Sequence, residues 1–396
     1  MDDQPKSVKD LLVEAKDASE LMVDLAYAAV FFDDEKLAQE VERLEERMNG
    51  HLRRLREVAM LAARSPEDAE AMAGVLWIAD AVEKIGDAAS DIARVVEARL
   101  GIPDALRRDL RHADEMTARV KVGATATVIG RALRELSLPT ETGMWVMAIR
   151  SGIEWQFDPG PDDVLSEGDV LLVRGPEEGV TLLRELAGAP GRPEPPDDDA
   201  PPLSELDRAV DILVELKDQS EAAVGLAYSS ILFNNRALAA EVGALEARSD
   251  SLHDELESWV LRAAPEARNP DDLRGLLRLG SASESMCDAA RDLTWYVEQG
   301  EPLHPVVQLA LEETEETSAE TLVEPETPAD GRSLKDLRLE TETGMFVLAV
   351  QRGPRWIYRP RGPFVLLAGD RLIAVGPEEG AEALDALCRV VAPAAS

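Results

Sequence analysis

The stretch that decides the fold is Gly143-Met144-Trp145-Val146-Met147-Ala148-Ile149-Arg150, which returns 201 positions later as Gly344-Met345-Phe346-Val347-Leu348-Ala349-Val350. Three further matches keep this separation: Tyr27 with Tyr228, Glu83 with Glu284, and Gly168-Asp169 with Gly369-Asp370. Between them the register slips by two or three residues only near predicted loops, where insertions are tolerated. The sequence therefore predicts a tandem duplication of one folded unit.

The first part of each copy has the pattern of a helical bundle. In the first copy, long helices are predicted over residues 7–32, 35–64 and 65–100. A capping serine followed by proline starts the third helix at Ser65, and a glycine and a proline end it. The second helix carries an apolar stripe at helical spacing, formed by Leu37, Val41, Leu44, Met48, Leu52 and Leu55. Three helices joined by short turns are expected to pack as an antiparallel bundle.

The apolar pattern then changes from helical spacing to short alternating runs. These runs predict strands over residues 119–122, 144–149, 153–157 and 169–173, with short helices over residues 130–136 and 176–186. The second copy repeats the pattern from about residue 321 to residue 387. Strands and helices segregated in this way indicate a small α+β lobe.

The predicted fold class is therefore α+β and multidomain: two antiparallel three-helix bundles, each followed by a small α+β lobe. The bundles are expected at residues 1–112 and 204–315, and the lobes at residues 113–188 and 316–391. Residues 189–203 are rich in proline and aspartate, which disfavour helix and strand alike. They are expected to form an extended linker.

The charge of the chain limits the classes of partner. Its 396 residues carry a formal net charge of −36, and only eight of the 42 basic residues are lysine. Concentrated salt relieves the self-repulsion of such a surface, so the composition favours a salt-rich cytoplasm, as in halophiles. An ordinary acidic protein from a genome that favours arginine is the alternative. Nucleic acid is not expected as a partner, because phosphate binding needs a basic surface.

Cysteine content and hydropathy favour the cytoplasm. Cys287 and Cys388 are too few for a disulfide framework. The N-terminus has neither a basic start nor an apolar core, so no secretory signal is expected. The longest uncharged run, residues 222–235, is shorter than the ~20 residues of a membrane helix. We therefore expect a cytoplasmic protein without a transmembrane segment.

Both lobes carry a longer pattern around the repeated stretch. In the first lobe it includes Gly130-x-x-Leu133-x-x-Leu136, Leu165-x-x-Gly168-Asp169-Val170-Leu171-Leu172-Val173 and Gly175-Pro176-Glu177-Glu178. In the second it includes Leu334-x-x-Leu337 and Leu367-x-Gly369-Asp370-Arg371-Leu372-Ile373. This pattern closely resembles the TrkA-C domain, the C-terminal lobe of the units that regulate potassium conductance. The resemblance covers most of both lobes.

The bundles resemble PhoU-type domains. Their third helices carry Glu83-Lys84-Ile85-Gly86-Asp87-Ala88-Ala89-Ser90-Asp91-Ile92-Ala93 and Glu284-Ser285-Met286-Cys287-Asp288-Ala289-Ala290-Arg291-Asp292-Leu293, which are similar to the acidic helix signature of that family. A PhoU-like bundle followed by a TrkA-C-like lobe, twice over, is similar to a class of prokaryotic soluble proteins linked to cation transport.

Acidic residues on these helices are the candidate metal ligands. The first helix carries Glu83, Asp87 and Asp91 at four-residue spacing, and the second carries Glu284, Asp288 and Asp292. Like charges at this spacing oppose helix formation by ~0.2–0.5 kcal/mol per pair, whereas a bound cation would reverse that sign. The resemblance to PhoU implies metal clusters on such helices.

Further ligands could come from the preceding helix of each bundle, through Glu45, Glu246 and Asp250. Asn49 stands at the position of Asp250 in the first copy and departs from the acidic pattern. The alternative to a metal site is a solvated acidic face. The four histidines form no zinc-type pair, so no cofactor is assigned beyond a metal cation on the acidic helices.

Four arginines crowd one predicted hairpin of the second lobe: Arg352, Arg355, Arg359 and Arg361. Their counterparts in the first copy are Ser151, Glu154, Asp158 and Gly160, so the basic group is confined to one lobe. Arginine suits carboxylate and phosphate, which favours an anion or nucleotide site, or a patch that docks a partner. Pairing with acidic surface elsewhere in the chain is the alternative.

No catalytic signature and no glycine-rich dinucleotide or P-loop motif is present, so an enzyme is not expected. The resemblance implies a soluble regulatory protein that senses a ligand or ion and acts on a membrane cation transporter or channel, with potassium as the ion. A PhoU-like metal-binding signalling regulator, a regulator of magnesium transport and a dimerising scaffold are the alternatives. The duplication predicts an intrachain pseudo-dimer, with a homodimer left open.

Overall fold

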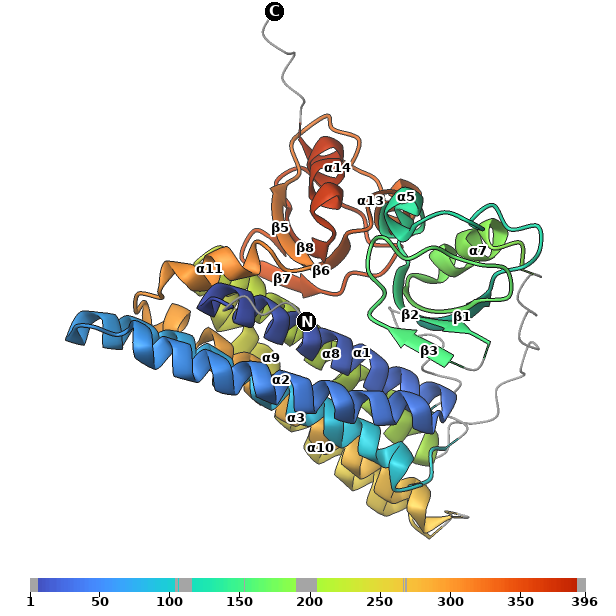
Figure 1. Cartoon of the computed structure of the whole chain (residues 1–396), viewed down its shortest axis with the longest axis horizontal. Helices are drawn as coiled ribbons and strands as arrows, with labels where there is room; N and C mark the ends of the chain where they lie inside the picture. Colours follow the sequence, from blue (N-terminus) through green and yellow to red (C-terminus); the bar gives the residue numbers. More distant parts are fainter. Residues whose placement is uncertain are drawn as a thin grey trace, which may run out of the picture. The chain divides into compact units, whose positions relative to one another are not determined.

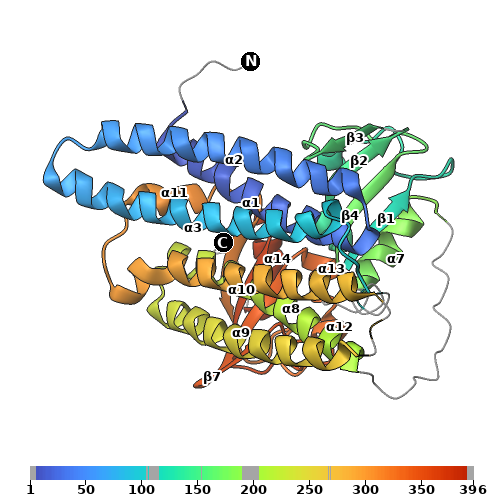
Figure 2. The same ribbon diagram turned by 90° about the horizontal axis from the view of Figure 1, so that it is seen from below.

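The computed structural model describes residues 6–103, 106, 116–152, 154–189, 205–265, 267 and 269–389 (Figures 1 and 2). All but the first residue of the predicted linker, and His112, lie outside the described residues. The chain forms two compact units, and each draws on both halves of the sequence. The helical unit comprises residues 1–113 and 200–315, and the lobe unit comprises residues 114–199 and 316–396.

The first bundle of the helical unit consists of α1 (Val8–Phe32), α2 (Glu35–Ala62) and α3 (Pro66–Glu97), close to the predicted ranges. Ser7 and Ser65 cap α1 and α3 through capping boxes, because each hydroxyl accepts a backbone N–H while the aspartate three residues on accepts in return. Between α1 and α2, Asp33 adopts a left-handed conformation and Asp34 caps the next helix. The leucines of the predicted stripe on α2 are buried, as is Met48.

The second bundle consists of α8 (Glu205–Leu232), α9 (Arg236–Ala263) and α10 (Pro270–Gln299). Asn235 and Asn269 replace the aspartate and serine caps of the first bundle. A short helix that the sequence did not predict, α11 (Pro305–Leu311), follows and packs against α1 and α8. It begins at a proline, and the Nδ1 of His304 accepts a hydrogen bond from the Val306 backbone N–H.

The two bundles pack along α3 and α10, which lie side by side in the helical unit (Figure 2). Glycine permits the close approach at both ends of this pair. A Cβ atom at Gly275 of α10 would lie 2.2 Å from the carbonyl oxygen of Gly101, and one at Gly74 of α3 would lie 3.2 Å from the Leu303 side chain. The helix-to-loop contact at one end is thus repeated, with the partners exchanged, at the other.

The lobe unit contains two four-stranded antiparallel sheets. The first consists of β1 (Met116–Lys121), β2 (Trp145–Ser151), β3 (Glu154–Phe157) and β4 (Val170–Gly175), in the order β1-β4-β2-β3. The second consists of β5 (Thr317–Leu322), β6 (Phe346–Arg352), β7 (Arg355–Tyr358) and β8 (Arg371–Gly376), in the order β5-β8-β6-β7. In both sheets the register shifts at the third residue of the strand that follows the repeated Gly-Met pair.

Short helices complete the lobes (Figure 1). They are α5 (Leu133–Leu136), α6 (Leu138–Thr142) and α7 (Glu177–Leu186) in the first lobe, and α12 (Leu334–Leu337), α13 (Leu339–Thr343) and α14 (Glu378–Cys388) in the second. The sequence predicted neither α6 nor α13, and these two helices pack against each other. Each lobe has its own buried apolar core. Because the chain combines helical bundles with separate antiparallel sheets, the fold is α+β.

Gly143 and Gly344 explain why the repeated stretch opens on glycine. Both have a positive φ, 73° and 71°, which side chains other than glycine rarely adopt. A Cβ at Gly143 would lie 2.9 Å from the carbonyl oxygen of Glu340, and one at Gly344 would lie 2.6 Å from that of Pro139. Among the residues described, no helix has both the length and the apolar character needed to cross a membrane.

Candidate metal centre

Carboxylates from two helices of the second bundle converge at one place. Glu246 and Asp250 lie one turn apart on α9, and Asp288 faces them from α10. One carboxylate oxygen from each residue lies within 4.8 Å of the others. Glu246 is almost buried at 9% exposure, whereas the other two are exposed to solvent. All three residues belong to the set that the sequence predicted.

The electrostatics of this group show an excess of negative charge. Burial, followed by the Glu246 and Asp250 carboxylates, raises the pKa of Asp288. Burial and the Asp288 carboxylate raise the pKa of Glu284, one turn earlier on α10. The Arg291 guanidinium offsets part of this charge, because its Nη1 lies 2.6 Å from Oε1 of Glu246. Three carboxylates beside one guanidinium keep a net negative charge, and their oxygen atoms are chemically suited to a hard divalent cation.

The matching place in the first bundle differs in composition. Asn49 replaces the aspartate, so this group has Glu45 and Asp87 as its carboxylates. The Ser90 hydroxyl donates a hydrogen bond of 2.6 Å to Glu45. Burial, Glu45 and Glu83 raise the pKa of Asp87. In the described part of the chain, the convergence of three ligands occurs only in the second bundle.

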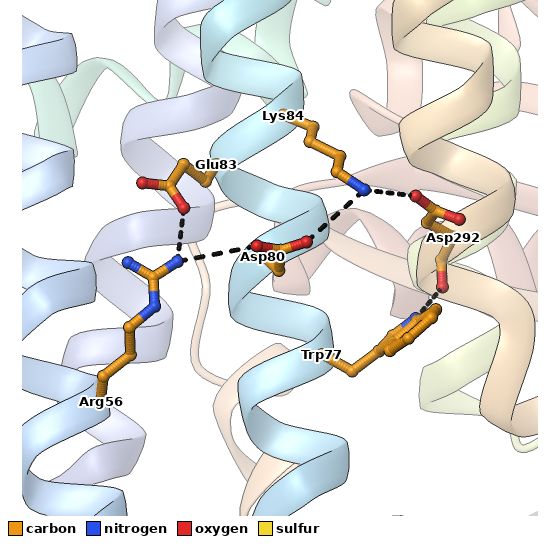
Figure 3. Close-up of polar contacts among 6 residues, drawn as sticks. All are labelled: Arg56, Trp77, Asp80, Glu83, Lys84 and Asp292. Carbon is orange, nitrogen blue, oxygen red and sulfur yellow. Dashed lines mark hydrogen bonds and ion pairs between the residues drawn. The ribbon is translucent and has the colours of Figure 1, made fainter.

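Glu83 has a partner of its own on α2. Its carboxylate accepts a short hydrogen bond from Arg56, and the Arg56 guanidinium also lies 3.9 Å from Asp80 (Figure 3). The line of Glu83, Asp87 and Asp91 predicted along one helix is therefore divided among different partners.

Asp91 and Asp292 lie at the seam between the bundles. The Arg278 guanidinium of α10 donates to the Asp91 carboxylate at 2.9 Å. In return, the Trp77 indole N–H of α3 donates to the backbone carbonyl of Asp292 at 2.6 Å, and Lys84 pairs with the Asp292 carboxylate at 2.7 Å (Figure 3). This role could not be predicted from the sequence, because the partners lie on the other bundle.

His253 was missed as a neighbour of the carboxylate cluster. It lies three residues after Asp250 on α9, and its Nε2 is 3.4 Å from the Ser281 hydroxyl of α10. Its charge acts to lower the pKa of Glu284, against the upward effect of burial. The signal was the helical spacing from Glu246 and Asp250, which a search for histidine pairs does not detect.

Two buried lysines form a second polar layer between the bundles that the sequence did not predict. Lys16 of α1 and Lys217 of α8 are 4% and 6% exposed. Each pairs with a glutamate four residues later at 2.7 Å. The Lys16 ammonium lies 5.5 Å from the Tyr228 ring centroid, and the Lys217 ammonium lies 5.1 Å from that of Tyr27. The contacts are again exchanged between the bundles.

The arginine group of the second lobe is divided by the fold. Arg352 forms a two-pronged ion pair with the buried Asp370, at 2.7 and 2.6 Å, and also donates to the carbonyl of Val365. Its counterpart Ser151 donates one hydrogen bond to Asp169. Arg359 is buried with its guanidinium 4.8 Å from the Phe346 ring, whereas Arg355 and Arg361 are exposed.

Comparison with known proteins identifies both kinds of domain. The TrkA-C domain model matches residues 117–188 and 319–389, and the PhoU domain model matches residues 12–96. No protein of curated function matches the chain.

Solved structures with similarity to this chain include two PhoU-type proteins and an RCK domain. PhoU from Pseudomonas aeruginosa is 15% identical, with a TM-score of 0.40, over 74% of this chain and 96% of that chain. A PhoU-like protein from Shewanella oneidensis is 13% identical, with a TM-score of 0.35, over 75% and 98%. The GsuK RCK domain is 15% identical, with a TM-score of 0.18, over 69% and 63%. The domain matches show that the chain is a protein that combines a PhoU-like domain with TrkA-C domains.

Proposed function

We propose that this protein regulates a membrane cation transport system, with potassium as the transported ion, and is not an enzyme. The observation that carries the proposal is the presence of two TrkA-C domains in a chain that also carries a PhoU-like domain. Both families are regulatory rather than catalytic. The protein would act in the cytoplasm, at the inner face of the membrane, through a transporter or channel as its partner.

A divalent cation at Glu246, Asp250 and Asp288 is the proposed signal. The geometry supports this part of the proposal, because the three ligand oxygens already lie within 4.8 Å of one another. Glu284 and His253 line the next turn and could extend the site. Glu45 and Asp87 offer a weaker counterpart, since Asn49 contributes no charge. A cation can transmit a signal only if it binds one arrangement of the protein better than another.

The two copies are proposed to form an intrachain pseudo-dimer, with domains at residues 1–112, 113–188, 204–315 and 316–391. Contacts that exchange partners support this idea, as expected at an interface of twofold type. Lys16 lies by Tyr228 as Lys217 lies by Tyr27. Within the lobe unit, the Gly143 contact with Glu340 is matched by that of Gly344 with Pro139.

Calorimetric titration of Mg²⁺, Mn²⁺ and Zn²⁺ into the full chain tests the metal site. We expect about one equivalent to bind, because the three carboxylates converge at one place and each offers an oxygen ligand. Asp288→Asn should weaken the affinity at least roughly tenfold, equivalent to about 1.4 kcal/mol. The matched control is Asp87→Asn in the first bundle, which should leave the isotherm of the second site unchanged. Identical isotherms for wild type and both variants would remove the carboxylate cluster from the proposal.

Rubidium uptake by cells of the source organism tests the transport role. Deletion of the gene should change the rate of uptake, and the wild-type chain should restore it. Restoration by wild type but not by Asp288→Asn would link the metal site to regulation. An unchanged uptake of rubidium together with a changed uptake of magnesium would favour the magnesium alternative.

A metal-responsive signalling regulator is the second candidate function, and the carboxylate cluster favours it. It differs from the first in its target. Deletion would then alter gene expression or phosphate uptake while rubidium uptake stays at the wild-type rate.

Separate production of residues 1–188 and 204–396 tests the pseudo-dimer. We expect the two halves to associate when mixed, because each covers the exchanged contacts of the other. Analytical ultracentrifugation of each half alone and of the mixture measures this association. Halves that remain monomeric together at high concentration would contradict the idea.

A further inference from the structure

Two tryptophans of the helical unit lie in contact at its surface. The ring centroids of Trp77 on α3 and Trp295 on α10 are 5.3 Å apart, and the Tyr296 ring lies 4.9 Å from that of Trp295. Each tryptophan is 40% exposed, whereas apolar residues beside them, such as Ile78 and Leu293, are buried. We call Trp77, Trp295 and Tyr296 the aromatic patch. Tryptophan and tyrosine are the residue types that most often anchor a contact between proteins.

The aromatic patch lacks a partner that three other tryptophans of this chain have. Arg208 and Arg262 lie over the Trp259 ring, 4.7 and 4.6 Å from its centroid. In the first lobe, guanidinium groups lie 5.5 or 5.9 Å from the centroids of two tryptophan rings. In the described part of the chain, no guanidinium or ammonium lies over either tryptophan of the patch. Because tryptophan is the best aromatic partner for a cation, the patch can take one from another molecule.

Carboxylates lie around the aromatic patch. Burial, Glu301 and Glu70 raise the pKa of the tyrosine of the patch, so both carboxylates act at its ring. One carboxylate from each helix, Asp80 and Asp292, lies three positions from the tryptophan of that helix (Figure 3). Lys84 lies 3.5 Å from the first of these and 2.7 Å from the second, and offsets part of their charge. The surroundings of the patch keep an excess of negative charge.

The matching positions at the other end of the seam carry arginine. Arg278 stands 201 positions after Trp77, and Arg94 stands 201 positions before Trp295. Both guanidinium groups bind the Asp91 carboxylate, at 2.9 and 3.0 Å. A cationic group is attracted to the aromatic end and repelled by the arginine end. The two ends of the seam therefore differ in the charge that they accept.

We infer that the aromatic patch is a docking site for a cationic segment of a partner protein, rich in arginine or lysine. The surrounding carboxylates repel the anionic headgroups of a membrane surface, and a net charge of −36 opposes docking of a second copy. Cytoplasmic loops of membrane proteins carry an excess of arginine and lysine, so a transporter would offer such a segment. In naming a transporter as the partner, the inference rests on the proposed function.

A labelled peptide of alternating arginine and alanine tests the docking site. Fluorescence polarisation measures its binding to the full chain in 1 M KCl, where a screening length of ~3 Å suppresses diffuse attraction to the acidic surface. Replacement of each arginine by citrulline, a neutral isostere, should weaken binding at least roughly tenfold, because the cation is lost. Trp77→Leu and Trp295→Leu should each weaken binding of the arginine peptide about fivefold, because the cation loses an indole face.

Trp259→Leu is the matched control. The chain's own arginines already cover that ring, so the variant should bind the peptide as wild type does. Ala73→Arg covers the case in which a tryptophan variant does not fold. It places a guanidinium one turn before Trp77, at an exposed position of α3, and should weaken peptide binding about fivefold while both rings remain.

Equal affinities of wild type, Trp77→Leu and Trp295→Leu would overturn the inference, as would a citrulline peptide that binds as tightly as the arginine one. Tryptophan-dependent binding to vesicles of phosphatidylcholine and phosphatidylglycerol, with no binding of the peptide, would show a membrane site instead. Rubidium uptake separates the two proposals. A changed uptake after gene deletion without peptide binding contradicts the docking site alone, and peptide binding with unchanged uptake contradicts the transport role alone.

Discussion

At the scale of single residues, the protein places charge where water cannot fully reach it. Lys16 and Lys217 are almost buried between helices, and Asp370 is buried beneath Arg352. A buried charge costs free energy unless it is paired, so the partner of each one is as important as the charge itself. The ion pair of Arg352 with Asp370 and the carboxylate cluster around Asp288 allow the cost of such charge to be measured, since a mutation should destabilise the first and stabilise the second.

Arg352→Ala should destabilise the second lobe by about 2 kcal/mol, because the buried Asp370 would lose its charge-assisted hydrogen bonds. The matched change in the first lobe is Ser151→Ala, which removes one neutral donor from Asp169 and should cost only about 1 kcal/mol. Urea unfolding monitored by fluorescence measures both. Equal losses at the two positions would show that the guanidinium contributes no more than a hydroxyl.

Asp288→Asn should have the opposite effect when no metal is bound. Burial and neighbouring carboxylates raise the pKa of Asp288 in the folded state. Its contribution to stability is then full below the ordinary aspartate value and is lost as pH rises through the raised pKa. With chelator present, the variant should therefore melt a few degrees higher than wild type at pH 7.5, and the difference should disappear near pH 4.

Calorimetric melting at the two pH values checks this expectation. Asp254→Asn, on the exposed side of α9, is the control and should change the free energy of unfolding by less than about 0.5 kcal/mol. A melting temperature of Asp288→Asn below that of wild type at pH 7.5 would mean that the carboxylate is already compensated without a cation.

At the scale of elements, the seam between α3 and α10 depends on glycine as much as on charge. The two helices approach the loops at each other's ends, and Gly275 leaves no space for a side chain. The ion pairs of the seam, such as that of Lys84 with Asp292, are exposed and contribute little by themselves. Packing should therefore decide whether the bundles stay together.

Gly275→Ala should destabilise the helical unit by about 2 kcal/mol, because the new methyl group would meet the Gly101 carbonyl oxygen at 2.2 Å. Gly243→Ala on α9 is the matched control: it meets nothing within 4 Å and should stabilise the helix by about 0.5–1 kcal/mol. Chemical unfolding of both variants measures the contrast. A stabilising effect of Gly275→Ala would show that the seam can open without cost.

At the scale of the whole molecule, the formal charge of −36 should make stability depend on salt. Screening shortens the range of repulsion from ~10 Å at 0.1 M to ~3 Å at 1 M. We expect the melting temperature to rise by about 5 °C or more between 0.2 and 2 M KCl. NaCl should act alike, since screening does not distinguish the two cations. A rise in KCl alone would instead indicate a specific potassium site.

Much of the fold could be predicted from the sequence, because its signals are local. Capping residues such as Ser65 and the apolar stripe on α2 predicted the helix positions to within a few residues. The alternation of apolar residues predicted the strands. The missed helices α6, α11 and α13 have five to seven residues, too few for a periodic pattern. Of the nine acidic residues predicted as metal ligands, three converge at one place in the described part of the chain: Glu246, Asp250 and Asp288. The seam roles of Asp91 and Asp292 could not be predicted, because their partners are about two hundred positions away.

The difference between Asn49 and Asp250, at matching positions of the two copies, has a consequence for how the chain can evolve. In an oligomer of identical subunits, a mutation in the one gene changes the same site in every subunit. A damaging change therefore affects all the sites at once. Here Asn49 and Asp250 are separate codons of one reading frame. One position can therefore carry an uncharged side chain while the other keeps its carboxylate, so that a change in one copy leaves the other copy unaltered without a second gene.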